Sequence, residues 1–457
     1  MDFTAQRLTF RPGQEGYEDE LAGFQTGFAQ RPDIVFAASG VDDVVAAVRY
    51  AAEAGLPVGV QATGHGLPDA ARGGVLISTR RMDSVAVDAD ARTVKIGAGV
   101  RWGQVVAAAA EHGLAPLNGS APSVGAVSYT LGGGLGILAR EFGYAADHVR
   151  SLDVVTADGT LRHVTADSEP ELFWGLLGGG AALGVVTGLE IGLVPVARLY
   201  GGALTFDGRA VDPAAILRAY ADWAATVPDE VTSSVAALVY PDLPMLPEHL
   251  RGRYLVTVRV AYTGEAAEGE RLVAPLRAIG PVFSDDLREL PYSESHTIHS
   301  DPDFPHSYYG ESRLLTALDD TAGLARVLSL TGPDADRMHV VQLNHLGGAL
   351  ARPAGNAVPH REAAWLLRVL SPLDATEPDA TDRETLRKLY AQAYGELAPH
   401  VLGGSLNFTF ASGDRPDGLY DAPTRKRLAG LKATYDPANL FRRNYGVGDA
   451  GDLSASR

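Results

Sequence analysis

A histidine flanked by two glycines is the first place in the chain where residue type and spacing could support chemistry. The motif Ala62-Thr63-Gly64-His65-Gly66 follows a short apolar run at 56–62. Glycine on both sides lets the backbone approach a ligand closely while the imidazole ring projects from it. A histidine in an ordinary turn gives the same pattern, so the motif alone leaves both interpretations open.

Two glycine-rich segments follow further along the chain. They are 131–136 (LGGGLG) and 178–184 (GGGAALG). So many glycines are costly inside a regular helix or strand, because glycine loses the most conformational freedom on folding. Successive free amides can instead form a concave surface that binds an anion. Either segment alone could be structural, but the two together favour a nucleotide ligand, with its pyrophosphate on backbone amides.

Several other sites are excluded or disfavoured. The chain has no cysteine, which excludes disulfides, thiolate metal sites and iron–sulfur clusters. Residues 97–103 have the spacing GxGxxxG, whereas a dinucleotide fold needs GxGxxG, and no P-loop motif occurs. His296, His299 and His306 lie in a polar stretch without the helical spacing of metal ligands, so we predict no metal site.

Length and charge narrow the partners. The 457 residues suggest two or three domains. The 39 basic and 56 acidic residues give a net charge of −17, which disfavours nucleic acid and membrane surfaces, and also a cationic phosphate-binding cleft. Because the N-terminus lacks a charged region followed by an apolar core, we expect a cytoplasmic protein.

The elements that must position these motifs change character along the chain. Over the first 200 residues, short strands alternate with helices, and the apolar spacing at 41–54 predicts a helix that ends at Gly55. Beyond that, longer strands and helices predict a second layered unit, with sheet segments at 338–346 and 349–352 and a helix at 361–370. The sequence therefore predicts an α+β fold.

Three blocks, at 31–74, 119–147 and 435–444 (YDPANLFRRN), together resemble the FAD-linked oxidases of the vanillyl-alcohol-oxidase type, specifically the berberine-bridge-enzyme-like branch. The resemblance implies a split FAD-binding domain of the PCMH type, with an inserted substrate domain of antiparallel sheet covered by helices. We expect the FAD-binding domain at 1–198, its PCMH-type part starting near residue 30. The substrate domain is expected at 199–403, and residues 404–457 should return to the FAD-binding domain.

The resemblance also implies FAD as cofactor. His65 matches the family's histidine that bonds to the 8α-carbon of the flavin through a ring nitrogen. The family's second link, through a cysteine, falls on Ala121, so we expect a single covalent bond. The other expected cofactor contacts are Thr63, Gly64, Gly66, Leu67, Ser123, Val124, Gly125, Ser128, Tyr129, Gly132, Gly133, Gly134, Val186 and Asn444.

The usual proton acceptors of the family are absent. Leu346 and Leu406 stand at two tyrosine positions, and Arg352 stands at a glutamate position. Alternation along an extended segment places Gln342 and Asn344 on the same face as Leu346. Arg352 shares that face if no bulge intervenes at the two glycines before it.

We therefore expect Gln342, Asn344 and Arg352 to face the flavin. Tyr445 is the best remaining candidate for the proton acceptor, because it follows Asn444 in the last block. The predicted activity is oxidation of a small organic molecule (an alcohol, a sugar or a secondary-metabolite intermediate), with hydride transfer to flavin N5 and O₂ as electron acceptor. The alternatives are an oxygenase or cyclase, or a binding protein that kept the FAD fold and lost its chemistry.

Overall fold

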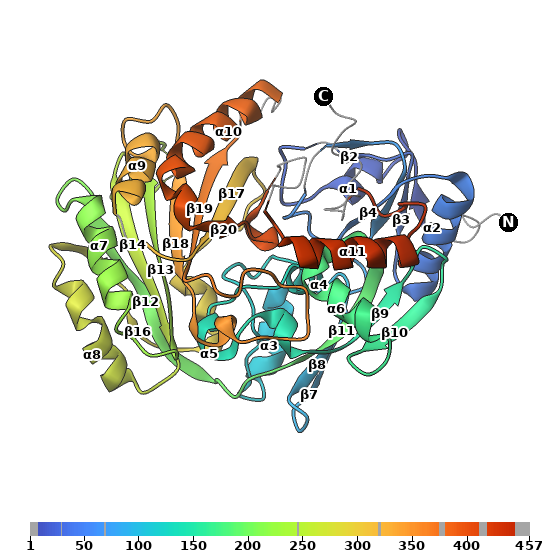
Figure 1. Ribbon diagram of the computed structural model, residues 1–457, viewed down its shortest axis with the longest axis horizontal. Coiled ribbons are helices and arrows are strands. Elements are labelled where there is room, and N and C mark those ends of the chain that lie inside the picture. Colours follow the sequence, from blue (N-terminus) through green and yellow to red (C-terminus); the bar gives the residue numbers. More distant parts are fainter. Residues whose placement is uncertain are drawn as a thin grey trace.

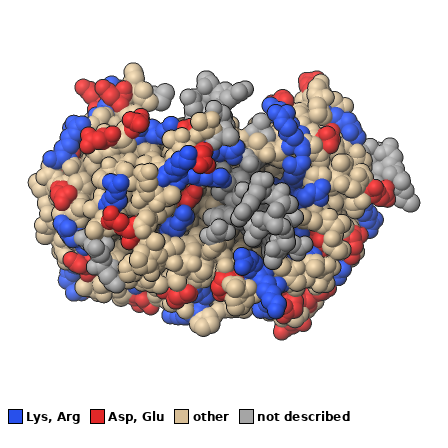
Figure 2. All heavy atoms as spheres, turned by 45° about the horizontal axis from the view of Figure 1, so that its top comes forward, with Lys and Arg blue, Asp and Glu red and all other residues tan. Residues whose placement is uncertain are grey.

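The computed structural model describes residues 8–28, 30–67, 70–244, 246–318, 321–373, 380–410 and 418–443. Figure 1 shows two lobes, with the N-terminal part of the chain, up to β11 (Val185–Gly192), in one and a large sheet backed by helices in the other. Lys and Arg are interspersed with Asp and Glu over the face seen in Figure 2, so the net negative charge is not gathered into one patch there. No helix in the described ranges has both the length and the hydropathy needed to cross a bilayer.

A small sheet near the N-terminus carries the His65 loop. Its order is β1-β3-β6-β4, and β3, β6 and β4 run parallel. The predicted helix is α2 (Val41–Ala54); it ends at Gly55, whose φ of 64° suits glycine. The strands are β1 (Thr9–Phe10), β3 (Ile34–Ala37), β4 (Val58–Gln61) and β6 (Val75–Ser78), and a separate parallel pair joins β2 (Gln30–Arg31) to β5 (Ala71–Arg72).

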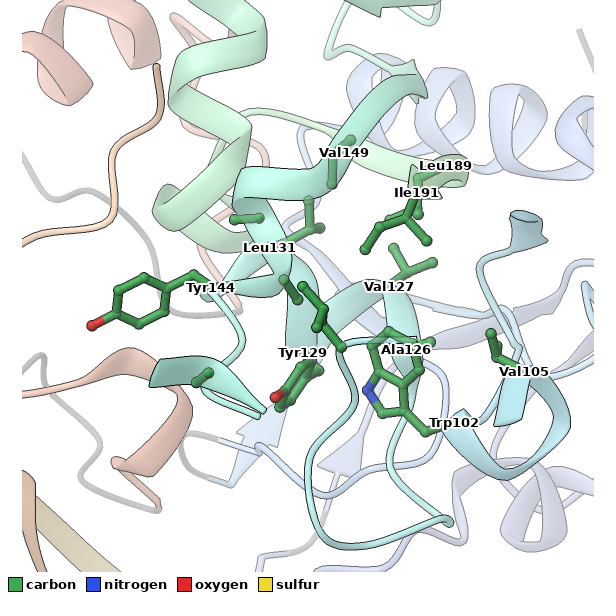
Figure 3. Close-up of a cluster of buried hydrophobic side chains, with 14 of the residues drawn as sticks. Trp102, Val105, Ala126, Val127, Tyr129, Leu131, Tyr144, Val149, Leu189 and Ile191 are labelled. Carbon is green, nitrogen blue, oxygen red and sulfur yellow. The ribbon is translucent and has the colours of Figure 1, made fainter. Parts of the chain in front are cut away.

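A five-stranded antiparallel sheet forms the second half of this lobe, in the order β10-β9-β11-β8-β7. Its core is centred on Trp102, which is fully buried beside Tyr129 (Figure 3). The strands are β7 (Val85–Asp88), β8 (Thr93–Gly97), β9 (Val149–Val155), β10 (Leu161–Thr165) and β11 (Val185–Gly192). The helices of this lobe are α1 (Tyr17–Leu21), α3 (Trp102–Ala110), α4 (Ala126–Leu131), α5 (Ala139–Phe142) and α6 (Pro170–Gly179).

The second lobe is built on a nine-stranded antiparallel sheet. Its order is β15-β12-β14-β13-β18-β19-β17-β20, with β16 also on β12. The strands are β12 (Arg198–Asp207), β13 (Val231–Val239), β14 (Tyr254–Tyr262), β15 (Val282–Asp285), β16 (Arg288–Pro291), β17 (Tyr308–Leu315), β18 (Val340–His345), β19 (Trp365–Pro372) and β20 (Val401–Gly403). The helices on its outer side are α7 (Pro213–Ala224), α8 (Ala266–Arg277), α9 (Thr321–Thr331) and α10 (Ala380–Tyr394) (Figure 1).

The two faces of this sheet differ in chemistry. Val235, Val258, Leu343 and Leu367 alternate onto the helix-covered face and form one apolar cluster with residues of α7, α9 and α10. The residues between them along each strand point to the opposite face, toward the N-terminal lobe. The sheet therefore has one apolar face packed against helices and a second face available to a ligand.

Two predictions in this lobe are wrong. The helix expected at 361–370 is the strand β19, because its short apolar run pairs in the middle of the sheet, between β18 and β17. The sheet segment expected at 349–352 is a 3₁₀ turn at Gly348–Ala351. Gly347 and Gly348 have φ of 82° and 58°, which turns the chain out of the strand.

The C-terminal part of the chain returns to the first lobe through α11 (Ala422–Tyr435), which packs on α6 (Figure 1). In the last turn of this helix, Lys432 Nζ lies 2.6 Å from the fully buried carboxylate of Asp436, the residue that follows the helix. That carboxylate also accepts the amides of Leu440 and Phe441 at 2.7 and 2.8 Å. This network fixes the turn in the YDPANLF block. Lys432 Nζ also donates to the Ala182 carbonyl at 2.9 Å, which ties the C-terminal segment to the first lobe.

Candidate functional site

His65 lies in the loop after β4, beside the segment that leads into α4. Its Nδ1 is 2.9 Å from Thr63 Oγ1, and its Nε2 is 3.2 Å from Ser123 Oγ. The ring stacks on Phe24, with ring centroids 3.9 Å apart. These contacts fix the orientation of the imidazole.

Burial, with the charges of Arg101 and His306 nearby, lowers the pKa of His65 to about 3. The imidazole is therefore neutral at physiological pH, and one ring nitrogen carries a lone pair. A ring nitrogen of this kind can act as a nucleophile or as a hydrogen-bond acceptor.

The backbone of this loop is shaped for a close neighbour. Gly64 has a φ of 71°, and a Cβ there would lie 2.8 Å from Gly23 Cα, so only glycine fits. Within the described residues, the amides of Gly64, His65 and Gly66 donate no hydrogen bond. These amides are free to bind an anion.

A cavity of about 650 Å³ lies next to the loop. Thr63, His65 and Ser123 line it, and so do Arg80 and Arg101. The expectation of a cleft without cations is therefore wrong, because a net charge describes the whole surface and not one cavity. The Arg80 guanidinium already donates to the carbonyls of residues 19, 20 and 22. The free amides, Arg101 and the neutral imidazole are therefore the groups that fit the phosphates of FAD and a flavin edge.

The predicted second segment lies beside the first one at Gly125. A Cβ on Gly125 would lie 3.5 Å from Thr63 Oγ1, and Ser128 Oγ donates back to the Gly125 carbonyl at 3.3 Å. Leu67 is buried, and Val124 packs against the core. The structure thus brings 63–67 and 123–128 together, whereas Asn444 and Tyr445 lie outside the described residues.

The run Gly132–Gly134 does not form an open anion site. The Gly132 and Gly133 amides donate to backbone carbonyls of the preceding turn, and the Gly134 amide donates to Asn407 Oδ1 at 2.9 Å. Asn407 Nδ2 in turn donates to the Tyr129 carbonyl at 3.0 Å. The prediction that this run cradles the pyrophosphate is wrong, because its three amides already have partners within the chain, one of them on the returning segment at 406–408.

Tyr129 and Val186 are core residues. These residues are 8% and 5% exposed and belong to the apolar cluster around Trp102. Figure 3 shows the Tyr129 ring beside Trp102. Burial raises the pKa of Tyr129 well above its usual value of 10. Its phenol therefore stays protonated and does not serve as a base.

A second cavity, of about 560 Å³, lies between the nine-stranded sheet and the first lobe; we call it the substrate cavity. Gln342 and Asn344 on β18 line it, as alternation predicted for their position. Arg368 Nη2 donates to Gln342 Oε1 at 2.6 Å, and Gln342 Nε2 donates to Asn344 Oδ1 at 2.6 Å. Ser120 and His299 line this cavity, whereas Ser123 and Asp303 line the cavity at His65, so the same two stretches of chain border both cavities.

Arg352 does not face this cavity. It is exposed and follows the 3₁₀ turn Gly348–Ala351. The positive φ values of Gly347 and Gly348 end the alternation at His345, so the condition on which its predicted position depended is not met. Leu346, by contrast, is buried at the cavity wall.

Sequence reasoning missed the charged groups of the substrate cavity. Arg259 on β14 and Arg368 on β19 both line it, with His299 beside them. Each arginine is a lone charge inside an apolar run, YLVTVRVAY and WLLRVL. A charge in a central strand is a signal that could have pointed to them, because such residues are rarely buried without a partner.

Comparisons with known proteins agree with this geometry. Residues 32–165 match the family described as FAD binding domain. The (R)-6-hydroxynicotine oxidase of Paenarthrobacter nicotinovorans is 28% identical over 452 residues, 96% of each chain. The chitooligosaccharide oxidase of Gibberella zeae is 25% identical, over 94% of this chain and 90% of that one. The crystal structure of 6-hydroxy-D-nicotine oxidase from Arthrobacter nicotinovorans has a TM-score of 0.83 at 26% identity and covers 98% of both chains. The chain is therefore an FAD-linked oxidase that is similar, over almost its whole length, to oxidases of the vanillyl-alcohol-oxidase type.

Proposed function

We propose that this FAD-dependent oxidase holds its flavin by a single covalent bond to His65 and oxidises a small organic molecule in the substrate cavity. The observation that carries the proposal is that the same two stretches of chain border two cavities, one at His65 and one at the polar face of the sheet. By their names, two relatives act on 6-hydroxynicotine and on chitooligosaccharides. Amines and sugars are therefore among the substrates to test.

His65 suits the covalent role for a physical reason. A pKa of about 3 leaves a ring nitrogen unprotonated, and the contacts to Thr63 and Ser123 aim the ring. The absence of cysteine leaves no residue for the family's second link. The amides at 64–66 and Arg101 would hold the phosphates.

Bound FAD would accept a hydride from a substrate C–H at N5 and pass the electrons to O₂. The protein's own part is to orient the substrate through Asn344 and the Gln342–Arg368 pair, and to keep water out with Leu346 and Phe408. No Asp or Glu lines the substrate cavity among the described residues.

Proton acceptance by Tyr445 stays a prediction. If Tyr445 is the base, Tyr445→Phe should slow flavin reduction by about 10²- to 10⁴-fold and leave FAD attached. Reduction at the wild-type rate would remove Tyr445 from the mechanism and favour the oxygenase or cyclase alternative, in which an acidic substrate needs no protein base. The domain limits at 198 and 403 and the cytoplasmic location also stay predictions.

The function is tested by anaerobic mixing of the yellow protein with a panel of alcohols, sugars and cyclic amines. We expect loss of the oxidised flavin absorbance with at least one compound, and peroxide release when O₂ is admitted. Incorporation of labelled oxygen from O₂ into the product would show an oxygenase instead. A flavin that no compound in the panel reduces would support the silent binding protein.

A further inference from the structure

The substrate cavity contains an unusual concentration of buried polar atoms without partners. Six such atoms lie on five of its lining residues: Arg259 Nε and Nη1, Arg368 Nε, Ser234 Oγ, His299 Nδ1 and His345 Nδ1. A buried polar group without a hydrogen bond costs free energy, and a buried charge costs more. Groups of this kind gathered in one cavity indicate a ligand that supplies the missing partners.

The strand register explains how these groups come together. On the cavity face, Ser234 of β13 lies directly between Arg259 of β14 and Asn344 of β18. In the next row, Gln342 lies opposite Arg368 of β19. The two guanidinium groups therefore stand on either side of a polar strip two strands wide.

The charges of the cavity do not balance. Asp301 is the acidic group that acts on both arginines, and its carboxylate accepts a hydrogen bond from Ser120 Oγ. Neither arginine forms an ion pair with it or with any other acid in the described chain. Burial and the charges of Arg259 and Arg368 lower the pKa of His299 against the opposing charge of Asp301, so we count its imidazole as neutral. Two cations face one carboxylate, which leaves a net charge of about +1 in a low-dielectric site.

Two contacts orient the Arg368 guanidinium inside the substrate cavity. Its Nη2 binds Gln342, and its guanidinium lies over the Phe408 ring, 5.3 Å from the centroid. Burial lowers the pKa of both arginines, yet an arginine side chain stays protonated in proteins. Its planar fork matches a carboxylate in two parallel hydrogen bonds.

We infer that the substrate of this oxidase carries a carboxylate, which Arg259 and Arg368 bind while an apolar body lies against Leu135, Ile137 and Phe408. This inference rests on the proposed function and names the substrate class of the same site. The volume of about 560 Å³ suits a small organic acid.

The test compares one anion with its neutral analogue on the flavin-loaded protein. Benzoate and benzamide share shape, so a difference in affinity reports the charge; flavin difference spectra give each dissociation constant. We expect benzoate to bind about 10- to 100-fold more tightly than benzamide. Arg259→Met and Arg368→Met should each remove that preference, and Arg368→Lys should retain part of it.

The matched control is Arg218→Met, at an exposed arginine on α7 behind the opposite face of the sheet. It should keep the wild-type preference for benzoate. Retained yellow colour after the arginine substitutions shows that the variants fold and bind FAD. Equal affinity for the two compounds in wild-type protein would overturn the inference. So would arginine variants that alter the flavin spectrum while keeping the preference, since the arginines would then serve the flavin. Absence of bound FAD would instead contradict the proposed function.

Discussion

The loop around His65 and the run Gly132–Gly134 are both rich in glycine, and they use their backbone in opposite ways. The amides at 64–66 have no partner among the described residues and border a cavity. The amides at 132–134 are all engaged, one of them by Asn407 from the returning C-terminal segment. Glycine serves ligand approach in the first segment and close chain packing in the second.

The second glycine-rich segment, at 178–184, follows the packing pattern. Gly178 has a φ of 110°, and a Cβ there would lie 2.5 Å from the backbone of Ala357. Its carbonyl accepts the Tyr420 hydroxyl at 2.7 Å. Both glycine runs thus pack against segments that come later in the chain, at 407 for the first run and at 357 and 420 for the second. Such contacts are expected of a split domain.

The largest stability effect is expected where glycine is required by both conformation and space. Gly134 has a φ of 78°, and a Cβ would lie 2.6 Å from Tyr129 Cε1 and 2.7 Å from Ala145 Cβ. Gly134→Ala should lower the free energy of unfolding by about 2–5 kcal/mol. Urea unfolding measures it, with Gly66→Ala as the matched control, since that site has ordinary φ and no atom within 4 Å. Equal stability of the two variants would erase the contrast between the segments.

A smaller loss is expected from the side chain that occupies the glycine run. Asn407→Ala removes the hydrogen bonds to the Gly134 amide and the Tyr129 carbonyl, and should cost about 1–3 kcal/mol. Asn407→Asp keeps the acceptor for Gly134 and should lose less. If the alanine variant has the same urea midpoint of unfolding as the wild-type protein, the hydrogen bonds of Asn407 do not stabilise the glycine run.

The smallest effect on stability is a gain, expected at a glycine that neither borders a ligand cavity nor allows close packing of the chain. Gly430 is exposed in α11, has ordinary φ, and would place a Cβ in open space. Gly430→Ala should raise the free energy of unfolding by about 0.5–1 kcal/mol, through helix propensity. A loss of stability at this position would indicate a constraint on α11 that the contacts do not show.

The spacing of apolar residues and glycines along the sequence was enough to predict much of the fold. The helix at 41–54 and its stop at Gly55 could be read from spacing, and the resemblance supplied the split FAD-binding architecture. The strand β19 could not be identified, because a short apolar run reads equally as helix or strand until its neighbours in the sheet are known.

Some residues of the candidate site could likewise be predicted from the sequence, and others could not. Gln342 and Asn344 were found by alternation, which holds within one strand. Arg352 was misplaced because two glycines with positive φ end that strand early. Arg259 and Arg368 were missed because the strand register that joins them links residues more than 100 positions apart in the sequence.

The central claim is a single covalent bond between His65 and FAD, and peptide mapping of the native protein tests it most directly. The yellow protein is precipitated with acid, digested, and its flavin-containing peptides are identified by mass spectrometry. We predict that the flavin stays with the precipitate and that one peptide, containing His65, carries the mass of FAD, while His65→Ala releases all flavin on denaturation. Release of all FAD from the wild-type protein, or a flavin bonded to any other residue, would contradict the account.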